Sequence, residues 1–299
     1  MADSQRRIDE KSSQTAAWTC VSRAASYLER DPLLHSDDDV ALELVPRPIK
    51  MLLHSTWLRR LFTQRVAPAG IYEYVITRTK AIDDALLAAL DDGIEQVLIM
   101  GAGFDSRALR FADRAGGARF FELDAPTTQG SKIAQYRKRG LAVPPNLVWV
   151  PIDFDKQSLP ERLDAVGFRR GARSLFLLEG LIMYLEAESV DATFRVIADY
   201  AGGGSRVVFD AVYADVIRGE GRRYGERDAA GRVSGAGESW RFGIEEGGVA
   251  DFLAPYGFRV EWLRDASALE AEYLTAADGR VAGRVNGTHL LVGAVVPEP

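Results

Sequence analysis

The sequence predicts an α/β protein: a doubly wound, mostly parallel sheet of seven strands with an antiparallel C-terminal edge and an N-terminal helical cap. Three observations predict this class. A strand-length apolar run breaks into Gly-Ala-Gly at residues 101–103, the turn that follows the first strand of Rossmann-like sheets. After Gly101, strand-like and helix-like patterns alternate, which is typical of a parallel sheet. Two strand-like runs close the chain, and such a pair favours an antiparallel edge.

The first 92 residues are predicted to form the helical cap, because their apolar residues recur at helical spacing. Four helices are expected: one around Trp18 that ends before Pro32, one that residues 37–39 cap and Pro46 ends, one over residues 49–66, and one over about residues 71–90. Proline and the acidic cap supply the physical boundaries, since proline cannot continue a helix and aspartate accepts hydrogen bonds from free amide groups.

Residues 93–299 are predicted to form the ligand-binding domain. Its candidate strands are residues 96–100, 118–123, 147–152, 174–179, 205–211, 258–263 and 289–296. A glycine- and arginine-rich segment, residues 214–243, follows the fifth strand and lacks a regular pattern. Long irregular segments are commonly lids or binding loops, so a lid insertion is expected here.

Composition excludes several classes of function. The chain has 299 residues, a net charge of −6 and one cysteine, Cys20, so it has neither the basic excess of a nucleic-acid-binding protein nor a cysteine metal cluster. No metal site is expected. The polar N-terminus lacks the apolar core of a signal peptide, and no apolar run has membrane-spanning length. We therefore expect a cytoplasmic protein with neither a nucleic-acid nor a membrane partner.

The glycine turn and the strand ends indicate the ligand's chemistry. Ser106 occupies the third position of the dinucleotide fingerprint in place of glycine, which weakens pyrophosphate binding as an interpretation. Acids lie at the ends of three successive strands, at Asp124, Asp153 and Glu179, where open α/β sheets bind ligands. Each acid taken alone could instead be a helix N-cap.

Arg78 is the other informative residue, because it lies in the apolar row of the fourth helix. A cation there needs an anionic partner, which is either a ligand carboxylate or a carboxylate of the domain itself. S-adenosylmethionine carries a ribose diol, two amines, a sulfonium and one carboxylate. These groups match three acids and one arginine.

Four motifs in order resemble the leucine carboxyl methyltransferase-like family of S-adenosylmethionine-dependent enzymes. They are RTKAIDD at 78–84, VLIMGAGFDSR at 97–107, FFELDAP at 120–126 and EGLIMYL at 179–185. The resemblance covers about residues 15–200 and is strongest to bacterial polyketide carboxyl O-methyltransferases and related enzymes. It implies the Rossmann-like methyltransferase fold and S-adenosyl-L-methionine as cofactor, and it suggests a role in secondary metabolism.

The resemblance also implies roles for individual residues. Arg78 would hold the cofactor's carboxylate, and Glu179 would lie near its amino group. The remaining implied cofactor contacts are Gly101 and Gly103 with the methionine part, Asp124 with the ribose, and Asp153 with Phe154 at the adenine. Residues 214–243 match no motif of the family, so the acceptor side is less defined.

The acceptor is expected to be a small organic acid or phenol. A carboxylate is ionised at neutral pH and needs no general base, whereas a phenol usually needs one, often histidine. The three histidines, His35, His54 and His289, do not follow the first five strands, and His289 reads as structural; this weakly favours a carboxylate.

No residue is assigned as catalytic. Tyr184, Tyr74 and Arg241 are the positioning candidates. Further candidates are Arg59 and Arg65 to orient an acid, and Tyr27, Tyr72, Tyr213 and Trp240 to wall an aromatic acceptor. Tyr184 could instead be core, and Arg59 or Arg60 could lie on a solvated helix face.

Three other functions remain possible at this point. A protein C-terminal carboxylate could be the acceptor, as the family's name implies. The same sheet could belong to a nicotinamide-dependent dehydrogenase, which Ser106 disfavours. The chain could also bind its ligand without turnover, because binding motifs do not report on chemistry.

Overall fold

The sheet has the predicted architecture. The computed structural model describes residues 14–153, 156–235 and 239–298, and its strands lie in the order β3-β2-β1-β4-β5-β8-β7. The strands are β1 Gln96–Met100, β2 Arg119–Asp124, β3 Leu147–Pro151, β4 Ser174–Leu178, β5 Arg206–Tyr213, β7 Arg259–Arg264 and β8 His289–Val295. β1 to β5 are parallel, and β8 is antiparallel to both β5 and β7. A two-residue strand that the sequence did not predict, β6 Gly243–Ile244, pairs with the end of β5.

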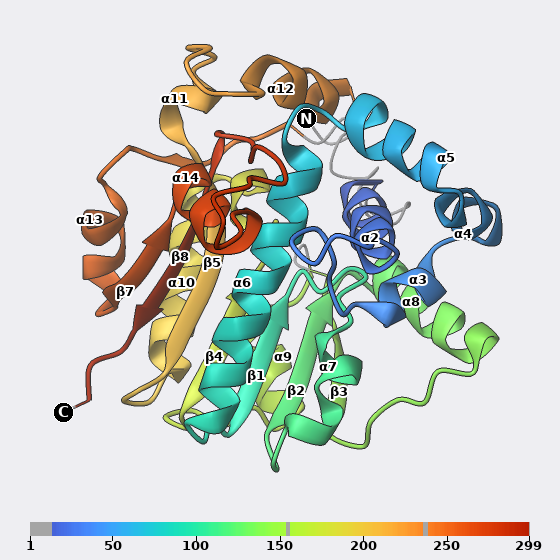
Figure 1. Cartoon of the computed structure of the whole chain (residues 1–299). Helices are drawn as coiled ribbons and strands as arrows, with labels where there is room; N and C mark the ends of the chain where they lie inside the picture. Colours follow the sequence, from blue (N-terminus) through green and yellow to red (C-terminus); the bar gives the residue numbers. More distant parts are fainter. Residues whose placement is uncertain (1–13, 154–155, 236–238, 299) are drawn as a thin grey trace.

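Helices cover both faces of the sheet (Figure 1). α6 Ile71–Asp91 runs along the front face, with α8 Pro126–Arg139 and α14 Ala266–Leu269 on the same side. The rear face is covered by α9 Leu159–Ala165, α10 Ala187–Tyr200 and α13 Val249–Leu253. The remaining short helices and turns are α7 Arg107–Arg110, the 3-10 turns Ala112–Arg114, Ile182–Tyr184 and Ala254–Tyr256, and the π-helical turn Glu270–Leu274.

Two apolar cores explain why the strands read as continuous apolar runs. In β1, Val97 and Ile99 pack into the front core, while Leu98 and Met100 pack into the rear core. All four side chains are at most 2% exposed. A strand buried on both faces has no polar alternation to show.

The N-terminal cap contains α2 Gln14–Tyr27, α3 Asp39–Leu44, α4 Arg47–His54 and α5 Thr56–Leu61, followed by a π-helical turn, Phe62–Val66. Asp38 caps α3 as predicted, since its carboxylate accepts the Ala41 N–H at 2.9 Å. None of the helices in the described part of the chain is long and apolar enough to cross a membrane.

The prediction of one helix over residues 49–66 was wrong. The chain breaks at Ser55, whose backbone is extended. The break frees the Leu53 carbonyl to accept a hydrogen bond from the Arg59 guanidinium at 2.7 Å, and it turns Leu53 and Arg59 inward, to 2% and 4% exposure. In an uninterrupted helix, the Leu53 carbonyl would instead accept a hydrogen bond from a backbone N–H of the next turn.

The segment from residue 214 to 243 is more regular than its composition suggested. It contains α11 Ala214–Ile217 and α12 Glu226–Gly235, and it ends at β6. Figure 1 shows α11 and α12 at the same edge of the sheet as α2 and the start of α6. That edge carries the carboxyl ends of the parallel strands.

Candidate cofactor site at the carboxyl edge of the sheet

The glycine turn after β1 requires glycine at two positions. Gly101 and Gly103 have φ of +66° and +48°, which side chains rarely adopt. A Cβ on Gly101 would lie 3.1 Å from Leu181 Cδ1, and one on Gly103 would lie 3.2 Å from Ala16 Cβ. The turn is therefore packed closely against the loop after β4 and against α2.

Asp124, at the end of β2, meets this turn directly. Its carboxylate accepts hydrogen bonds from the Gly103 N–H and, at 2.6 Å, from the Ala125 N–H. Burial raises the pKa of Asp124, although both N–H donors lower it. The structure thus brings Asp124 beside the turn, and its contact with a ribose stays a prediction.

Arg78 lies in a buried ion-pair network. Its Nη1 is 2.6 Å from Asp210 Oδ2, and its Nη2 is 2.8 Å from Glu179 Oε1. Asp210 also accepts hydrogen bonds from the Gly180 N–H at 2.6 Å and the Tyr74 hydroxyl at 2.7 Å. The domain carboxylates that formed the structural alternative for Arg78 are present, while Arg78 Nε is buried without a hydrogen-bond partner.

Glu179 lies between two arginines. Its second oxygen is 2.6 Å from Nη1 of Arg107, a residue that is 1% exposed and also pairs with Asp83 and Asp105. Burial opposes ionisation of Glu179, but Arg107 and Arg78 outweigh it and hold its pKa below its usual range. Glu179 is therefore a carboxylate whose orientation is determined on both oxygens.

The whole network has one more carboxylate than arginines. Its members are Arg23, Arg78, Arg107 and Arg110 with Asp38, Asp83, Asp105, Glu179 and Asp210. An edge of the sheet with an excess of negative charge favours a cationic ligand. Arg107, Asp105 and Asp210 were missed as site residues, although a signal existed for Asp210: it is an acid inside the apolar strand VVFDAV, residues 207–212.

Of the two residues predicted to lie at the adenine, the structure describes only Asp153. Asp153 follows β3, and its carboxylate is 2.7 Å from Lys156 Nζ. The backbone places Asp153 near Asp124, because the Ile152 N–H donates to the Asp124 carbonyl at 3.0 Å. Phe154 lies outside the described residues.

The three positioning candidates lie in different surroundings. Tyr74 is 2% exposed and donates its hydroxyl to Asp210, so that hydroxyl belongs to the ion-pair network. Tyr184 lies in the 3-10 turn after β4, next to Met183, whose carbonyl accepts the Arg241 N–H at 2.7 Å. The Arg241 guanidinium pairs with Glu186 at 2.7 Å.

Several other candidates lie away from the edge or have other partners. Arg59 is neither solvated nor turned to the site, since it pairs with Glu29 at 2.8 Å inside the cap. Arg60, Arg65 and His54 are exposed. His289, which read as structural, is buried against Tyr74 and Trp240, with ring centroids 4.3 and 5.3 Å apart.

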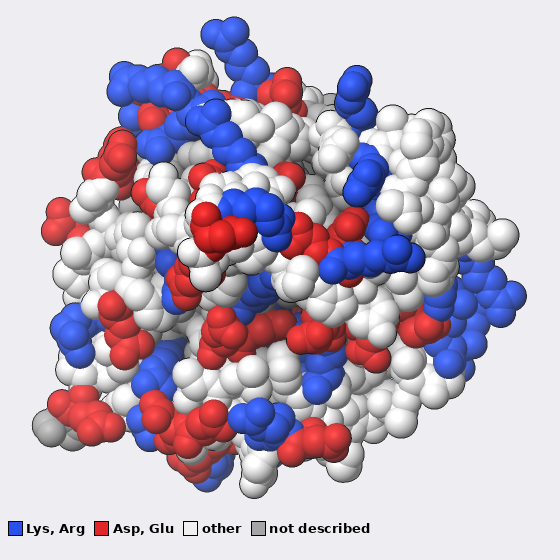
Figure 2. All heavy atoms as spheres, viewed as in Figure 1, with Lys and Arg blue, Asp and Glu red and all other residues white. Residues whose placement is uncertain are grey.

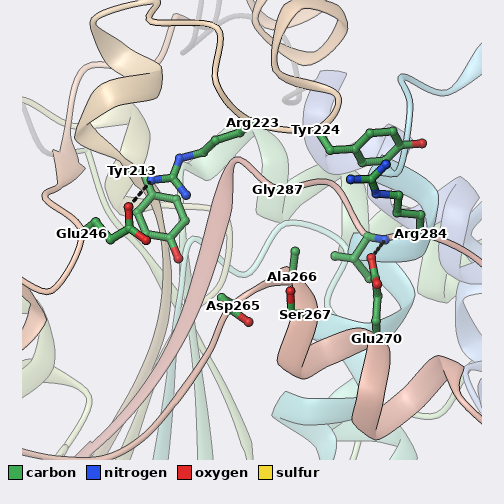
Figure 3. A pocket seen from close by; sticks show the side chains of 11 residues that line it. Tyr213, Arg223, Tyr224, Glu246, Asp265, Ala266, Ser267, Glu270, Arg284 and Gly287 are labelled. Carbon is green, nitrogen blue, oxygen red and sulfur yellow. Dashed lines mark hydrogen bonds and ion pairs between the residues drawn. The ribbon is translucent and has the colours of Figure 1, made fainter.

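A cavity of about 280 Å³ opens beside the end of β5 (Figure 3). Arg223 lies over the Tyr213 ring at 3.4 Å and pairs with Glu246 at 3.2 Å. Arg284 lies over the Tyr224 ring at 4.0 Å. The remaining lining residues are Asp265, Ala266, Ser267, Glu270, Val285 and Gly287. Of the sequence candidates, this cavity includes Tyr213 alone.

The residues at the edge fit S-adenosylmethionine. Side chains would be crowded at the glycine turn, Arg78 Nε is an unpartnered buried donor, and the network carries excess negative charge for a cationic ligand. Gly101, Gly103, Asp124 and Glu179 come from the ends of β1, β2 and β4, which are neighbours in the sheet. When bound, this cofactor supplies an electrophilic methyl group on a sulfonium.

Comparison with known proteins agrees with this fit. A family model described as leucine carboxyl methyltransferase matches residues 16–198. A Mycolicibacterium smegmatis protein, provisionally named an S-adenosyl-L-methionine-dependent methyltransferase, is 31% identical over 229 residues, which are 75% of this chain and 71% of that protein. A similarly named Frankia alni protein is 33% identical over 133 residues, which are 44% of this chain and 46% of that protein.

A solved structure shows that the fold is shared. The crystal structure of a provisionally named methyltransferase from Thermobifida fusca matches with a TM-score of 0.57 at 14% identity, covering 92% of this chain and 94% of that one. The motifs and the relatives agree on S-adenosyl-L-methionine as the methyl donor. The chain belongs to the leucine carboxyl methyltransferase family of S-adenosylmethionine-dependent methyltransferases.

Proposed function

We propose that the chain is an O-methyltransferase that acts on a carboxylate or phenol of a small organic molecule, such as a polyketide. The observation that carries this proposal is that α2 and residues 214–235 cover the carboxyl edge of the sheet. Arg23 of α2 donates to the Phe104 carbonyl at 2.7 Å and pairs with Asp38 at 2.8 Å. The cap is thereby tied to the glycine turn itself.

Residues 214–235 cover the same edge from the other side. A Cβ on Gly225 would lie 2.3 Å from the Ala69 carbonyl oxygen, so this segment packs directly against the start of α6. A covered site admits a small molecule more readily than a protein tail or a nucleic acid. The net charge of −6 and the mixture of acidic and basic side chains on the face in Figure 2 also oppose nucleic-acid binding.

Oxygen is the proposed nucleophile because the family is named for methylation of a carboxyl group. Methyl transfer from a sulfonium is an in-line displacement, so the residues of this chain act mainly by positioning. Arg78 and Glu179 would orient the amino acid part of the donor, Asp124 its ribose, and Asp153 with Phe154 its adenine. Tyr184, Tyr74 and Arg241 stay candidates for the acceptor side.

The first test is calorimetric titration with S-adenosylhomocysteine, with NAD in parallel. We expect micromolar binding of the former and no heat from the latter; the reverse result would contradict the cofactor and favour a dehydrogenase. Mass spectrometry should then detect methyl transfer to aromatic acids or phenols. Transfer only to a peptide ending in leucine would instead make the chain a protein carboxyl methyltransferase, and binding without any transfer would make it a binding protein.

A further inference from the structure

His289 occupies a buried position next to the ion-pair network. It opens β8 and pairs in register with Val212 of β5, two residues beyond Asp210, so the His289 and Asp210 side chains lie on the same face of the sheet. Its ring stacks on Tyr74 and meets the edge of Trp240, and the residue is 6% exposed. The ring therefore lies between α6 and the segment before β6.

A chain of hydrogen bonds determines which ring nitrogen carries the proton. The Asn286 amide nitrogen donates to the Ala69 carbonyl at 2.8 Å, and Asn286 Oδ1 accepts the Thr288 N–H at 3.1 Å. The Thr288 hydroxyl also donates to Asn286 Oδ1. Because an amide oxygen can only accept, the single proton of the Thr288 hydroxyl lies in this hydrogen bond. Thr288 Oγ1 must then accept from His289 Nδ1, 2.7 Å away. The proton is on Nδ1, and Nε2 presents a lone pair.

Two groups without a hydrogen-bond partner lie on rings that meet at nearly a right angle, with centroids 5.3 Å apart. His289 Nε2 has no hydrogen-bond partner among the described residues, and Trp240 Nε1 is buried without one. The first group can only accept and the second can only donate. A hydroxyl does both, whereas a carboxylate would turn its own lone pairs toward Nε2.

We propose that His289 Nε2 is the general base of the transfer, and that the acceptor is therefore a phenolic hydroxyl rather than a carboxylate. This inference rests on the proposed O-methylation and reverses the weak preference for a carboxylate. The acceptor oxygen bonds to the methyl carbon, the bond from that carbon to the sulfonium sulfur breaks, and its electron pair stays on sulfur. The hydroxyl proton passes to Nε2 and is released to water with the products.

The surroundings keep this base available. Burial lowers the pKa of His289 to about 4, with Asp210 opposing and Arg78 assisting. The charged and titratable groups that face the ring are Tyr74 and Arg78 on α6 and Asp210 on β5. A weak base suffices, because a phenol oxygen that is gaining a methyl group becomes strongly acidic as the bond forms.

The test compares His289→Gln with His54→Gln, a substitution of an exposed histidine on α4. Each variant receives benzoate and two phenols: unsubstituted phenol, which is almost wholly protonated at neutral pH, and the more acidic p-nitrophenol, which is about half ionised there. We expect His289→Gln to lower kcat for phenol about 100-fold or more, to change p-nitrophenol little, and to leave S-adenosylhomocysteine affinity within about threefold. His54→Gln should match the wild type throughout.

The pH profile gives a readout that a merely structural role would not move. The wild-type rate with phenol should be nearly level from pH 6 to 9, whereas the rate of His289→Gln should rise about tenfold per pH unit, as phenolate forms in solution. Thr288→Val, which removes the hydroxyl from the chain of hydrogen bonds but keeps the side-chain shape, should lower the phenol rate in the same direction. It serves as the test if His289→Gln fails to fold.

Equal losses on phenol and p-nitrophenol, or no loss on either, would overturn the role of His289. Wild-type transfer to benzoate and not to phenols would overturn it as well, while the proposed O-methylation stands. Binding of S-adenosylhomocysteine without transfer to any oxygen acceptor would contradict the proposed function and this inference together.

Discussion

At the scale of single residues, the site consists mainly of buried charges that neutralise one another. Arg78, Arg107 and Glu179 would each be costly to bury alone, and each has at least two charged partners. A ligand that joins this network must compete with the existing pairs. One variant of Arg78 can therefore test both its structural ion pairs and its proposed contact with the cofactor.

Arg78→Lys keeps the charge but removes the fork that reaches two carboxylates. We expect the dissociation constant for S-adenosylhomocysteine to rise at least tenfold, because an ammonium carries its donors on one atom and cannot reach the separate positions of Nη1, Nη2 and Nε. Calorimetry measures this. Arg114→Lys, in an exposed pair with Asp91, is the matched control. Lower stability with unchanged affinity would leave Arg78 a structural role alone.

His289 also predicts a pH dependence of stability. Its folded pKa, about 4, is below the unfolded value of 6.5, so the unfolded chain binds more protons between these values. This contribution to the free energy of unfolding is complete above pH 6.5 and is lost as the pH falls toward 4, by about 3 kcal/mol.

Urea unfolding at pH 4.5 and pH 7 measures the effect. The wild type should lose more stability on acidification than His289→Gln, while His54→Gln should follow the wild type. Parallel losses in all three proteins would show that His289 is not held neutral.

At the scale of elements, the strands and the glycine turn followed from pattern, whereas the third helix did not. Periodicity cannot report that Ser55 breaks the helix, because the break is stabilised by contacts from outside it. Arg59 bonds to Leu53 O within the cap and to Glu29, thirty positions earlier. The cap's shape therefore depends on a side chain that looked like a solvated arginine.

Arg59→Met tests this dependence. The substitution keeps much of the side-chain volume but leaves Glu29 and the Leu53 carbonyl unpaired, and we expect it to lower the free energy of unfolding by about 2–4 kcal/mol. Arg60→Met, at the exposed neighbouring position, should change it by less than about 0.5 kcal/mol. Hydrogen exchange over residues 47–66 should quicken in the first variant only; equal behaviour would contradict the role of Arg59.

At the scale of the whole molecule, the cofactor edge is assembled from segments that lie far apart in the chain. α2, the glycine turn, the loop after β4 and residues 69–78 meet there. Because these segments come together only in the folded chain, a ligand that binds at this edge binds the folded state and stabilises the whole fold.

Thermal unfolding checks this prediction. At a concentration one hundred times its dissociation constant, S-adenosylhomocysteine should contribute about 2.7 kcal/mol and raise Tm by about 5 °C. NAD at the same concentration is the control and should leave Tm unchanged. An equal shift with NAD would contradict selective binding.

The sequence by itself determined the class of fold, the glycine turn, the acids at the strand ends and the family, because strand burial, left-handed glycines and ordered motifs are local properties. Only the tertiary structure decided how the charges pair and which tautomer His289 adopts. Arg107 reaches Glu179 across 72 positions, Arg78 reaches Asp210 across 132, and Asn286 reaches Ala69 across 217. Hydrogen bonds and ion pairs depend on distances in space, which a linear pattern does not contain.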